Sequence, residues 1–242
     1  MTRVGTALYS GATELWRTPV LVALLVIAPA YVIYVFTLVA PEGLAIVHVG
    51  GTTVQTTLPA AFPAFTTPMT AALLTGITGL FLMETASGDS RLVVAGFRSY
   101  QVVLARLGLL IAVAGVATGI SVGVMLTAFT PNHLPFFVLG TGLTALVYGM
   151  IGLITGVLLD RLPGVYLILF GSMIDLFIFQ NPLATDPPAV ATLLPGHFPL
   201  RLAMEAGFAS TVDIAPLGWA LAYLAGVTGL ATIAFSREMR LS

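Results

Sequence analysis

The sequence contains few residues that could do chemistry, and Asp175 is the most distinctive of them. It lies about eleven residues into the apolar segment 165–179, within Leu-Ile-Leu-Phe-Gly-Ser-Met-Ile-Asp. An ionised carboxylate costs several kcal/mol in lipid unless it is paired or faces water, so Asp175 is a candidate for the path of a transported substrate. The alternative is structural: the segment leaves the membrane early, and Asp175 hydrogen-bonds a neighbouring helix near the outer headgroups.

The other reactive residue types argue against catalysis by this chain. His48, His133 and His197 fall in different connecting segments, and their spacing predicts no metal site. The sequence has no Cys, so it offers no thiolate nucleophile or thiolate metal ligand. It also has no Lys, which a phosphate-binding P-loop requires. We therefore expect no enzyme activity and no cofactor in this chain, and any ATP-driven work must be done by another polypeptide.

Composition identifies the solvent in which these residues lie. Of 242 residues, 58% are hydrophobic and 8% are charged, whereas about a quarter of the residues in a soluble domain are charged. Too few polar residues remain to cover a water-soluble globule. A formal net charge of −1 also gives no electrostatic footprint for nucleic acid. The sequence predicts an all-α integral membrane protein with a single transmembrane domain over residues 1–242.

Runs without charge give the number of membrane spans, since a spanning helix needs about 20 apolar residues. After Glu42, the segment 43–63 mixes Gly, Thr and Pro with short β-branched runs, which predicts an extended loop rather than a helix. Pro29 lies inside the first run and predicts a kink there. Six spans are predicted, at about 19–39, 67–83, 107–129, 136–159, 165–179 and 217–235.

The nine Arg residues predict the orientation, because cytoplasmic loops are enriched in basic residues. With both termini in the cytoplasm, only Arg201 lies outside. Residues 1–18 have apolar and polar positions at helical spacing, which predicts a helix in the membrane surface anchored by Trp16. A plain cytoplasmic tail and a signal peptide cleaved near Ala30 are the alternatives. The eight Arg residues predicted on the cytoplasmic side are Arg3, Arg17, Arg91, Arg98, Arg106, Arg161, Arg237 and Arg240.

Small residues recur at four-residue spacing in three predicted spans. Such stripes let helix backbones approach closely in lipid, so we interpret them as packing faces rather than as substrate contacts. The stripes are Gly115, Gly119 and Gly123 in the third span, Gly152 and Gly156 in the fourth, and Gly218, Ala222 and Gly226 in the sixth.

The charged segment 84–106 between the second and third spans resembles the corresponding segment of ABC-2 type permeases, the membrane subunits of ATP-binding cassette exporters. In that family the second span ends in an acid, continues to a Gly and a Leu, forms a short coupling helix, and re-enters the membrane behind a basic residue. The matching residues are Glu84, Gly88, Leu92 and Arg106. The resemblance implies a partner-coupling surface that includes Glu84, Gly88, Asp89, Arg91, Leu92, Phe97 and Arg98.

The same resemblance extends along the whole chain. It implies the N-terminal elbow helix, and two short outside helices between the fifth and sixth spans, near 190–194 and 199–208. The length and the segment 175–182 are similar to permeases that export drugs of the fluoroquinolone type. The implied protein is a multi-pass subunit of a prokaryotic cell membrane. Its implied partners are a cassette ATPase that binds ATP and Mg²⁺, a second permease chain (the same or a sister subunit) and membrane lipid.

The sequence departs from the family pattern in two places, and two other functions remain as alternatives. The coupling segment lacks the frequent Pro of the family, and Asp89 stands where a Thr is common. One rival is a secondary transporter that uses Asp175 to carry a proton or sodium ion. Another is a membrane scaffold that recruits a soluble protein without transport. The nearly uncharged spans suit a lipophilic drug or lipid better than a sugar polymer.

Overall fold

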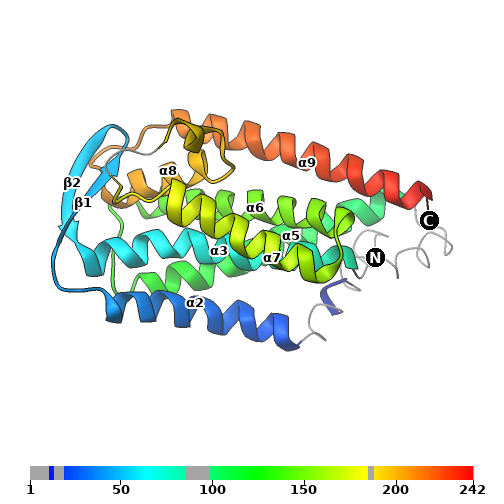
Figure 1. Ribbon diagram of the computed structural model, residues 1–242, viewed down its shortest axis with the longest axis horizontal. Coiled ribbons are helices and arrows are strands. Elements are labelled where there is room, and N and C mark those ends of the chain that lie inside the picture. Colours follow the sequence, from blue (N-terminus) through cyan, green and yellow to red (C-terminus); the bar gives the residue numbers. More distant parts are fainter. Residues whose placement is uncertain (1–10, 14–18, 85–98, 185–187, 242) are drawn as a thin grey trace.

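The computed structural model describes residues 11–13, 19–84, 99–184 and 188–241. Six helices in this part of the chain are long and apolar enough to cross a membrane, which confirms the prediction of a helical, multi-pass membrane protein. They lie side by side in one elongated bundle (Figure 1). The elements that form them are α2 (Pro19–Val39), α3 (Leu58–Glu84), α5 (Ser99–Met125), α6 (Leu134–Leu158), α7 (Arg161–Met173) with η2 (Ile174–Phe179), and α9 (Ala215–Leu241).

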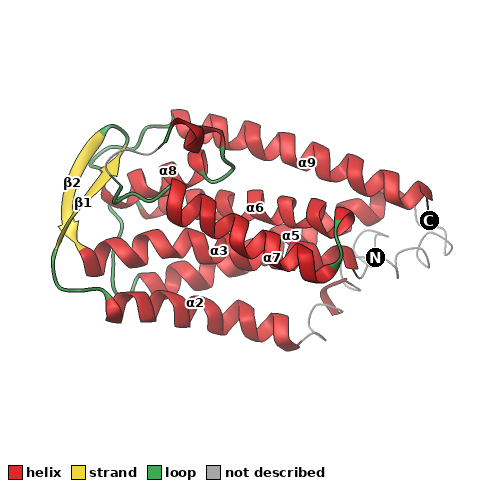
Figure 2. Cartoon of the chain, in the orientation of Figure 1, coloured by secondary structure: helices red, strands yellow, loops and turns green. Residues whose placement is uncertain are grey.

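Helices α3 and α6 form the centre of the bundle, and α2 and α9 lie on its outside (Figure 2). In α3, 83% of the candidate span is buried, against 11% in both α2 and α9. Between α3 and α6 the backbones touch, because Gly79 packs on Gly149 and Gly152 packs on Gly76. A Cβ at Gly79 or Gly152 would overlap the backbone carbonyl of the facing glycine and push the two helices apart, so these two glycines set the central contact.

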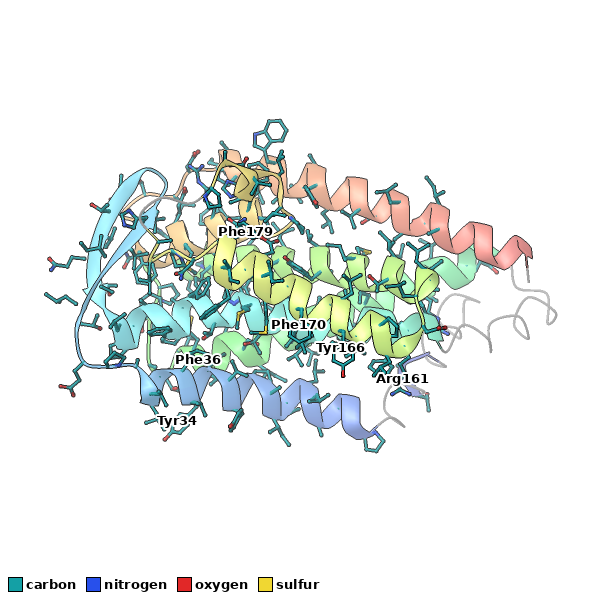
Figure 3. The ribbon with its side chains drawn as sticks, in the orientation of Figure 1. Tyr34, Phe36, Arg161, Tyr166, Phe170 and Phe179 are labelled. Atoms are coloured by element: carbon teal, nitrogen blue, oxygen red, sulfur yellow. The ribbon has the colours of Figure 1, made fainter. Side chains whose placement is uncertain are left out.

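The outer helices present apolar side chains to the surrounding lipid. Tyr34 on α2 is 60% exposed and points away from the bundle, whereas Phe36 points inward (Figure 3). Phe36 contacts Phe62 of α3 and Phe177 of η2, at ring-centroid distances of 6.1 and 6.5 Å. Such aromatic pairs bury large apolar areas, and here they fix α2 against the rest of the bundle.

The predicted loop over residues 43–63 is wrong in detail, because its first part is a paired hairpin. Strands β1 (Leu44–Val49) and β2 (Thr52–Thr57) pair in antiparallel register around Gly50 and Gly51. Both glycines have positive φ, 57° and 79°, which a two-residue turn of this kind requires. Alternate residues of β1 are buried against the bundle: Ala45, Val47 and Val49.

The second span also begins earlier than predicted. Helix α3 starts at Leu58, whereas the sequence indicated a span from about residue 67. Pro63 and Pro68 lie inside the helix, which neighbouring helices in a membrane protein tolerate. The extra turns are held by packing, since Phe65 joins the cluster of buried residues under the hairpin. Thr67 and the other threonines of α3 bond back to carbonyls four residues earlier, so their hydroxyls are satisfied inside the bundle.

Candidate functional site

A short helix, α8 (His197–Phe208), enters the bundle from the hairpin end and reaches only half its length. At its C-terminal end, the backbone N–H of His133 donates to the carbonyl oxygen of Ala206 at 2.8 Å. Farther along, Gly140 of α6 packs against the backbone of Ala203. Nine of its twelve residues are buried. At 1.5 Å per residue α8 is about 18 Å long, so it is a half-helix that runs antiparallel to the hairpin-end part of α6.

Asp175 lies at the inner, N-terminal end of this half-helix. Its carboxylate is 4% exposed and accepts hydrogen bonds from three elements. The donors are the hydroxyl of Tyr148 on α6, the Nε2 amide of Gln180 at 3.2 Å, and the backbone N–H of Gly196 at 2.8 Å. Tyr148 is about 21 Å from the first residue of α6 and about 15 Å from the last, at 1.5 Å per residue. The network therefore lies deep in the bundle.

The local structure around Asp175 explains how one carboxylate meets so many donors. After α7 the chain widens into the π-helical turns of η2, which carry Asp175 and the buried Leu176. Gly196 is the N-cap of α8. A Cβ on Gly196 would collide with the end of the Leu176 side chain and lie 2.9 Å from Oδ2 of Asp175, so glycine lets its N–H approach the carboxylate without displacing either side chain. The N-terminal dipole of α8 adds to these charge-assisted bonds and stabilises the buried negative charge.

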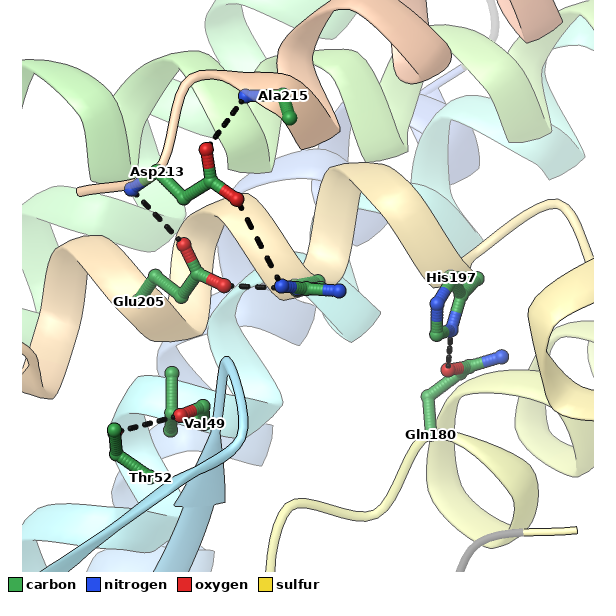
Figure 4. Close-up of polar contacts among 8 residues, drawn as sticks. Val49, Thr52, Gln180, His197, Glu205, Asp213 and Ala215 are labelled. Carbon is green, nitrogen blue, oxygen red and sulfur yellow. Dashed lines mark hydrogen bonds and ion pairs between the residues drawn. The ribbon is translucent and has the colours of Figure 1, made fainter.

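A second polar cluster lies toward the hairpin end of α8 (Figure 4). Glu205 is 3% exposed and accepts a bond from Nε of Arg201 at 2.8 Å and from the backbone N–H of Asp213 at 3.2 Å. Nη2 of Arg201 also lies 3.9 Å from Oδ2 of Asp213. The other oxygen of Asp213 accepts the N–H of Ala215 at the start of α9. This cluster joins α8 to α9.

The hairpin turn rests on the same cluster. A Cβ on Gly50 would lie 2.6 Å from Oε1 of Glu205, so the turn packs directly on the carboxylate. The backbone N–H of His48 donates to the carbonyl oxygen of Pro182 at 2.8 Å. The hairpin is therefore attached both to α8 and to the segment that follows η2.

A cavity of about 400 Å³ lies between the hairpin turn, residues 179–184, η3 (Ala189–Leu193) and α8. His48 and His197 both line it, although they are far apart in the sequence. His197 is half-buried, and burial together with the nearby charge of Arg201 lowers its pKa below 6.5, against an opposing effect of Asp175. Gln180 lies between the cavity and Asp175, because its side chain contacts both His197 and the carboxylate.

The predicted packing glycines fall into two groups. A Cβ on Gly152 would overlap the carbonyl oxygen of Gly76, and one on Gly156 would lie 2.7 Å from that of Leu80, so both positions pack tightly against α3. In contrast, a Cβ added to any glycine of the predicted stripe on α5 would have no described atom within 4 Å. That stripe is Gly115, Gly119 and Gly123.

The predicted partner-coupling residues lie almost entirely beyond the residues that the structure describes. Glu84 is the last residue of α3. The remaining six fall in the range 85–98, outside the described residues: Gly88, Asp89, Arg91, Leu92, Phe97 and Arg98. Over the described ranges, no group of three or more His, Cys, Asp or Glu side chains could hold a metal ion.

Sequence reasoning missed most of the partners of Asp175. Tyr148 is separated from it by 27 residues and Gly196 by 21, so no local motif joins them. The available signals were weak: a Tyr in the middle of a predicted span, and a Pro-Gly pair before a short apolar segment. Glu205 gave a clearer signal, as an acid four residues after Arg201 in the predicted outside helix.

Comparison of the chain with models of known protein families gives no match, and comparison with curated proteins gives no significant match either.

Proposed function

We propose that this chain is the membrane-spanning permease subunit of an ATP-binding cassette exporter of the ABC-2 type. The observation that carries the proposal is the combination of six apolar helices with the charged connection 84–106, where Glu84, Gly88, Leu92 and Arg106 match the family pattern. The short helix α8 between the last two spans supports it, because the resemblance implies short helices at this place in the chain. The ATPase would be a separate subunit that binds ATP and Mg²⁺.

The orientation follows from the distribution of Arg. With both termini in the cytoplasm, the connection 84–106 and the α6–α7 turn at Arg161 face the cytoplasm, and the hairpin with α8 faces outward. A short helix in 84–101 would act as the lever on which the ATPase pushes. Two permease chains would then rock against each other and move substrate outward between the second and fifth spans.

The surroundings of Asp175 favour this reading over an ion-coupled transporter. A proton or sodium carrier must exchange its ion with water during each cycle. The Asp175 carboxylate is 4% exposed and is bonded by Tyr148, Gln180 and Gly196. This arrangement suits a fixed structural charge that joins α6, η2 and α8. In this proposal Asp175 positions α8, and the energy for transport comes from the partner.

The substrate class follows from the chemistry of the spans. Among the described residues of the six candidate spans, the buried charged side chains are Arg106 and Asp175. A path with so little charge suits a lipophilic drug or a lipid better than a polar polymer, because each polar group of the substrate would lose hydration without gaining a partner.

The experiment that tests the proposal is purification of the chain from the membranes of its host. We expect a P-loop ATPase to co-purify with the wild-type chain. The double variant Leu92→Glu, Phe97→Glu should lose the ATPase, because two charges on the apolar face of the coupling segment would oppose docking. The matched control, Ser90→Glu with Ser99→Glu, adds the same charge nearby and should retain it. Retention of the ATPase by the Leu92, Phe97 variant would count against the coupling role.

A further inference from the structure

The cavity under the hairpin has the size and lining of a small-molecule site. Its volume of about 400 Å³ falls within the range of roughly 300–1,000 Å³ that ligand pockets occupy. Apolar walls come from Val49, Phe179, Leu200 and Met204. Eight of its nineteen described lining residues have polar side chains, namely His48, Thr52, Thr53, Gln180, Asn181, Thr192, His197 and Arg201. Gln180, which bonds Asp175, and Arg201, which bonds Glu205, both line the cavity, so the cavity adjoins the contacts that hold α8.

The hydrogen bonds of Gln180 determine which nitrogen of His197 carries the proton. The side-chain nitrogen of Gln180 lies 3.2 Å from Oδ1 of Asp175 and 2.7 Å from the carbonyl oxygen of Ala191. Both are acceptors, so this end of the amide must be the NH₂ group. The Oε1 atom of Gln180 then faces Nδ1 of His197 at 3.0 Å. Nδ1 must therefore donate the hydrogen bond.

A neutral His197 with its proton on Nδ1 has a free lone pair on Nε2. Among the described residues, none hydrogen-bonds Nε2, and the ring lines the cavity. The ring is neutral at pH 7, because burial and Arg201 lower its pKa. At the cavity wall, Nε2 of His197 is therefore a hydrogen-bond acceptor, and this tautomer is fixed by the chain of bonds from Asp175 through Gln180.

The charges around the cavity argue against an anion as its occupant. Nε of Arg201 is bonded to the buried Glu205, and its Nη2 approaches Asp213, so its positive charge is already compensated. Asp175 adds a further negative charge behind Gln180. Among the described residues, the charges that act on His197 are those of Arg201 on α8 and Asp175 on η2, and His48 of β1 lines the same cavity.

We propose that this cavity binds a small, largely apolar molecule that donates a hydrogen bond to Nε2 of His197. Phenols and other uncharged hydroxyl-bearing aromatic compounds have this chemistry. The apolar walls bind the body of the molecule, and the imidazole selects for the donor. Binding to this cavity requires neither an ATPase nor transport. The binding test therefore gives a result that does not depend on the proposed exporter function.

The test uses two matched probes, 4-(trifluoromethyl)phenol and 4-(trifluoromethyl)anisole, which differ by one hydrogen-bond donor. Binding is measured by ¹⁹F NMR at pH 7.5 with the chain in lipid nanodiscs, and empty nanodiscs give the partition into lipid. The phenol should bind about fivefold more tightly than the anisole, the difference expected for one hydrogen bond of about 1 kcal/mol. In His197→Phe the two probes should bind equally. Equal binding to the wild-type chain would overturn the proposal.

Two further variants keep the result interpretable if His197→Phe fails to fold. Ala189→Trp adds bulk at the wall of the cavity at a residue that does not hydrogen-bond Gln180, so both probes should bind more weakly. Ala222→Trp adds the same side chain on the outer face of α9 and should change neither probe. Unchanged binding in Ala189→Trp would place the probes elsewhere and contradict the site.

A change of pH gives a separate readout. As pH falls below the lowered pKa of His197, the imidazole gains a proton on Nε2 and loses its lone pair, so the advantage of the phenol over the anisole should disappear. Affinity for the anisole should not change. If 4-(trifluoromethyl)benzoate bound more tightly than the phenol, and did so more strongly at low pH, the cavity would be an anion site and the proposal would be wrong.

Discussion

Helices α6 and α8 come into backbone contact at Gly140, which has no side chain to separate them. A Cβ at this position would lie 2.7 Å from the backbone nitrogen of Ala203 and 2.9 Å from the carbonyl oxygen of Pro199. Both neighbours are backbone atoms and cannot rotate away. In Gly140→Ala, α8 must therefore move about 0.7 Å from α6 to restore a van der Waals separation of 3.4 Å.

The cost of this displacement is about 1–3 kcal/mol, the usual range for overpacking a close-packed interior. Replacing a helical Gly by Ala also contributes up to about 1 kcal/mol of helix propensity in the opposite direction. Gly142→Ala is the matched control. Its added Cβ meets only Oγ1 of Thr118, at 3.8 Å, and it gains the same propensity. The difference between the two variants therefore isolates the contact with α8.

The assay is thermal unfolding of both variants in the same detergent at one scan rate. A difference of about 2 kcal/mol corresponds to a melting temperature about 4–8 °C lower for Gly140→Ala than for Gly142→Ala in a chain of this size. Indistinguishable melting temperatures would refute the reasoning, because they would mean that α8 does not rest on α6 at Gly140.

Three further predictions concern the hairpin turn, the buried carboxylate and pH. Gly50→Ala and Gly51→Ala both strain a residue with positive φ, but only the first meets a buried carboxylate, so it should melt at the lower temperature. Tyr148→Phe removes a hydrogen bond to the charged Asp175 and should lower the free energy of unfolding by about 1.5–3 kcal/mol. When Tyr148→Phe is made in an Asp175→Asn background, the decrease in the free energy of unfolding should be smaller. The pKa of His197 is lower in the folded chain than its unfolded value of 6.5, so its contribution to stability is present above that value and is lost as pH falls. The melting temperature of the wild type should accordingly drop more between pH 7 and 5 than that of His197→Gln, and equal drops would contradict this.

The helices that cross the membrane were predictable wherever charge or turn residues bounded an apolar run. Helix α2 has the predicted bounds, because Thr18 and Pro41 limit its run on both sides. The start of α3 was not predictable in this way. Its first turns contain Pro63, and they are helical because they pack under the hairpin, a contact between segments that local patterns do not reveal.

The candidate site was predictable only in part, for a related reason. A lone charge in an apolar run stands out, so Asp175 could be identified from the sequence. Its partners could not, because Tyr148 and Gly196 meet it through the folding of α8 back into the bundle. The cavity was even harder to predict from the sequence, because His48 and His197 line it only after the hairpin packs against α8.

The central claim, that a partner ATPase moves this chain, is tested most directly by cross-linking in the membrane. The sequence has no Cys, so Leu92→Cys creates the only thiol in the chain for a photoreactive maleimide. The account predicts that the main protein adduct, identified by mass spectrometry, is a P-loop ATPase. Adducts with lipid alone, or with proteins that lack a P-loop, would contradict it.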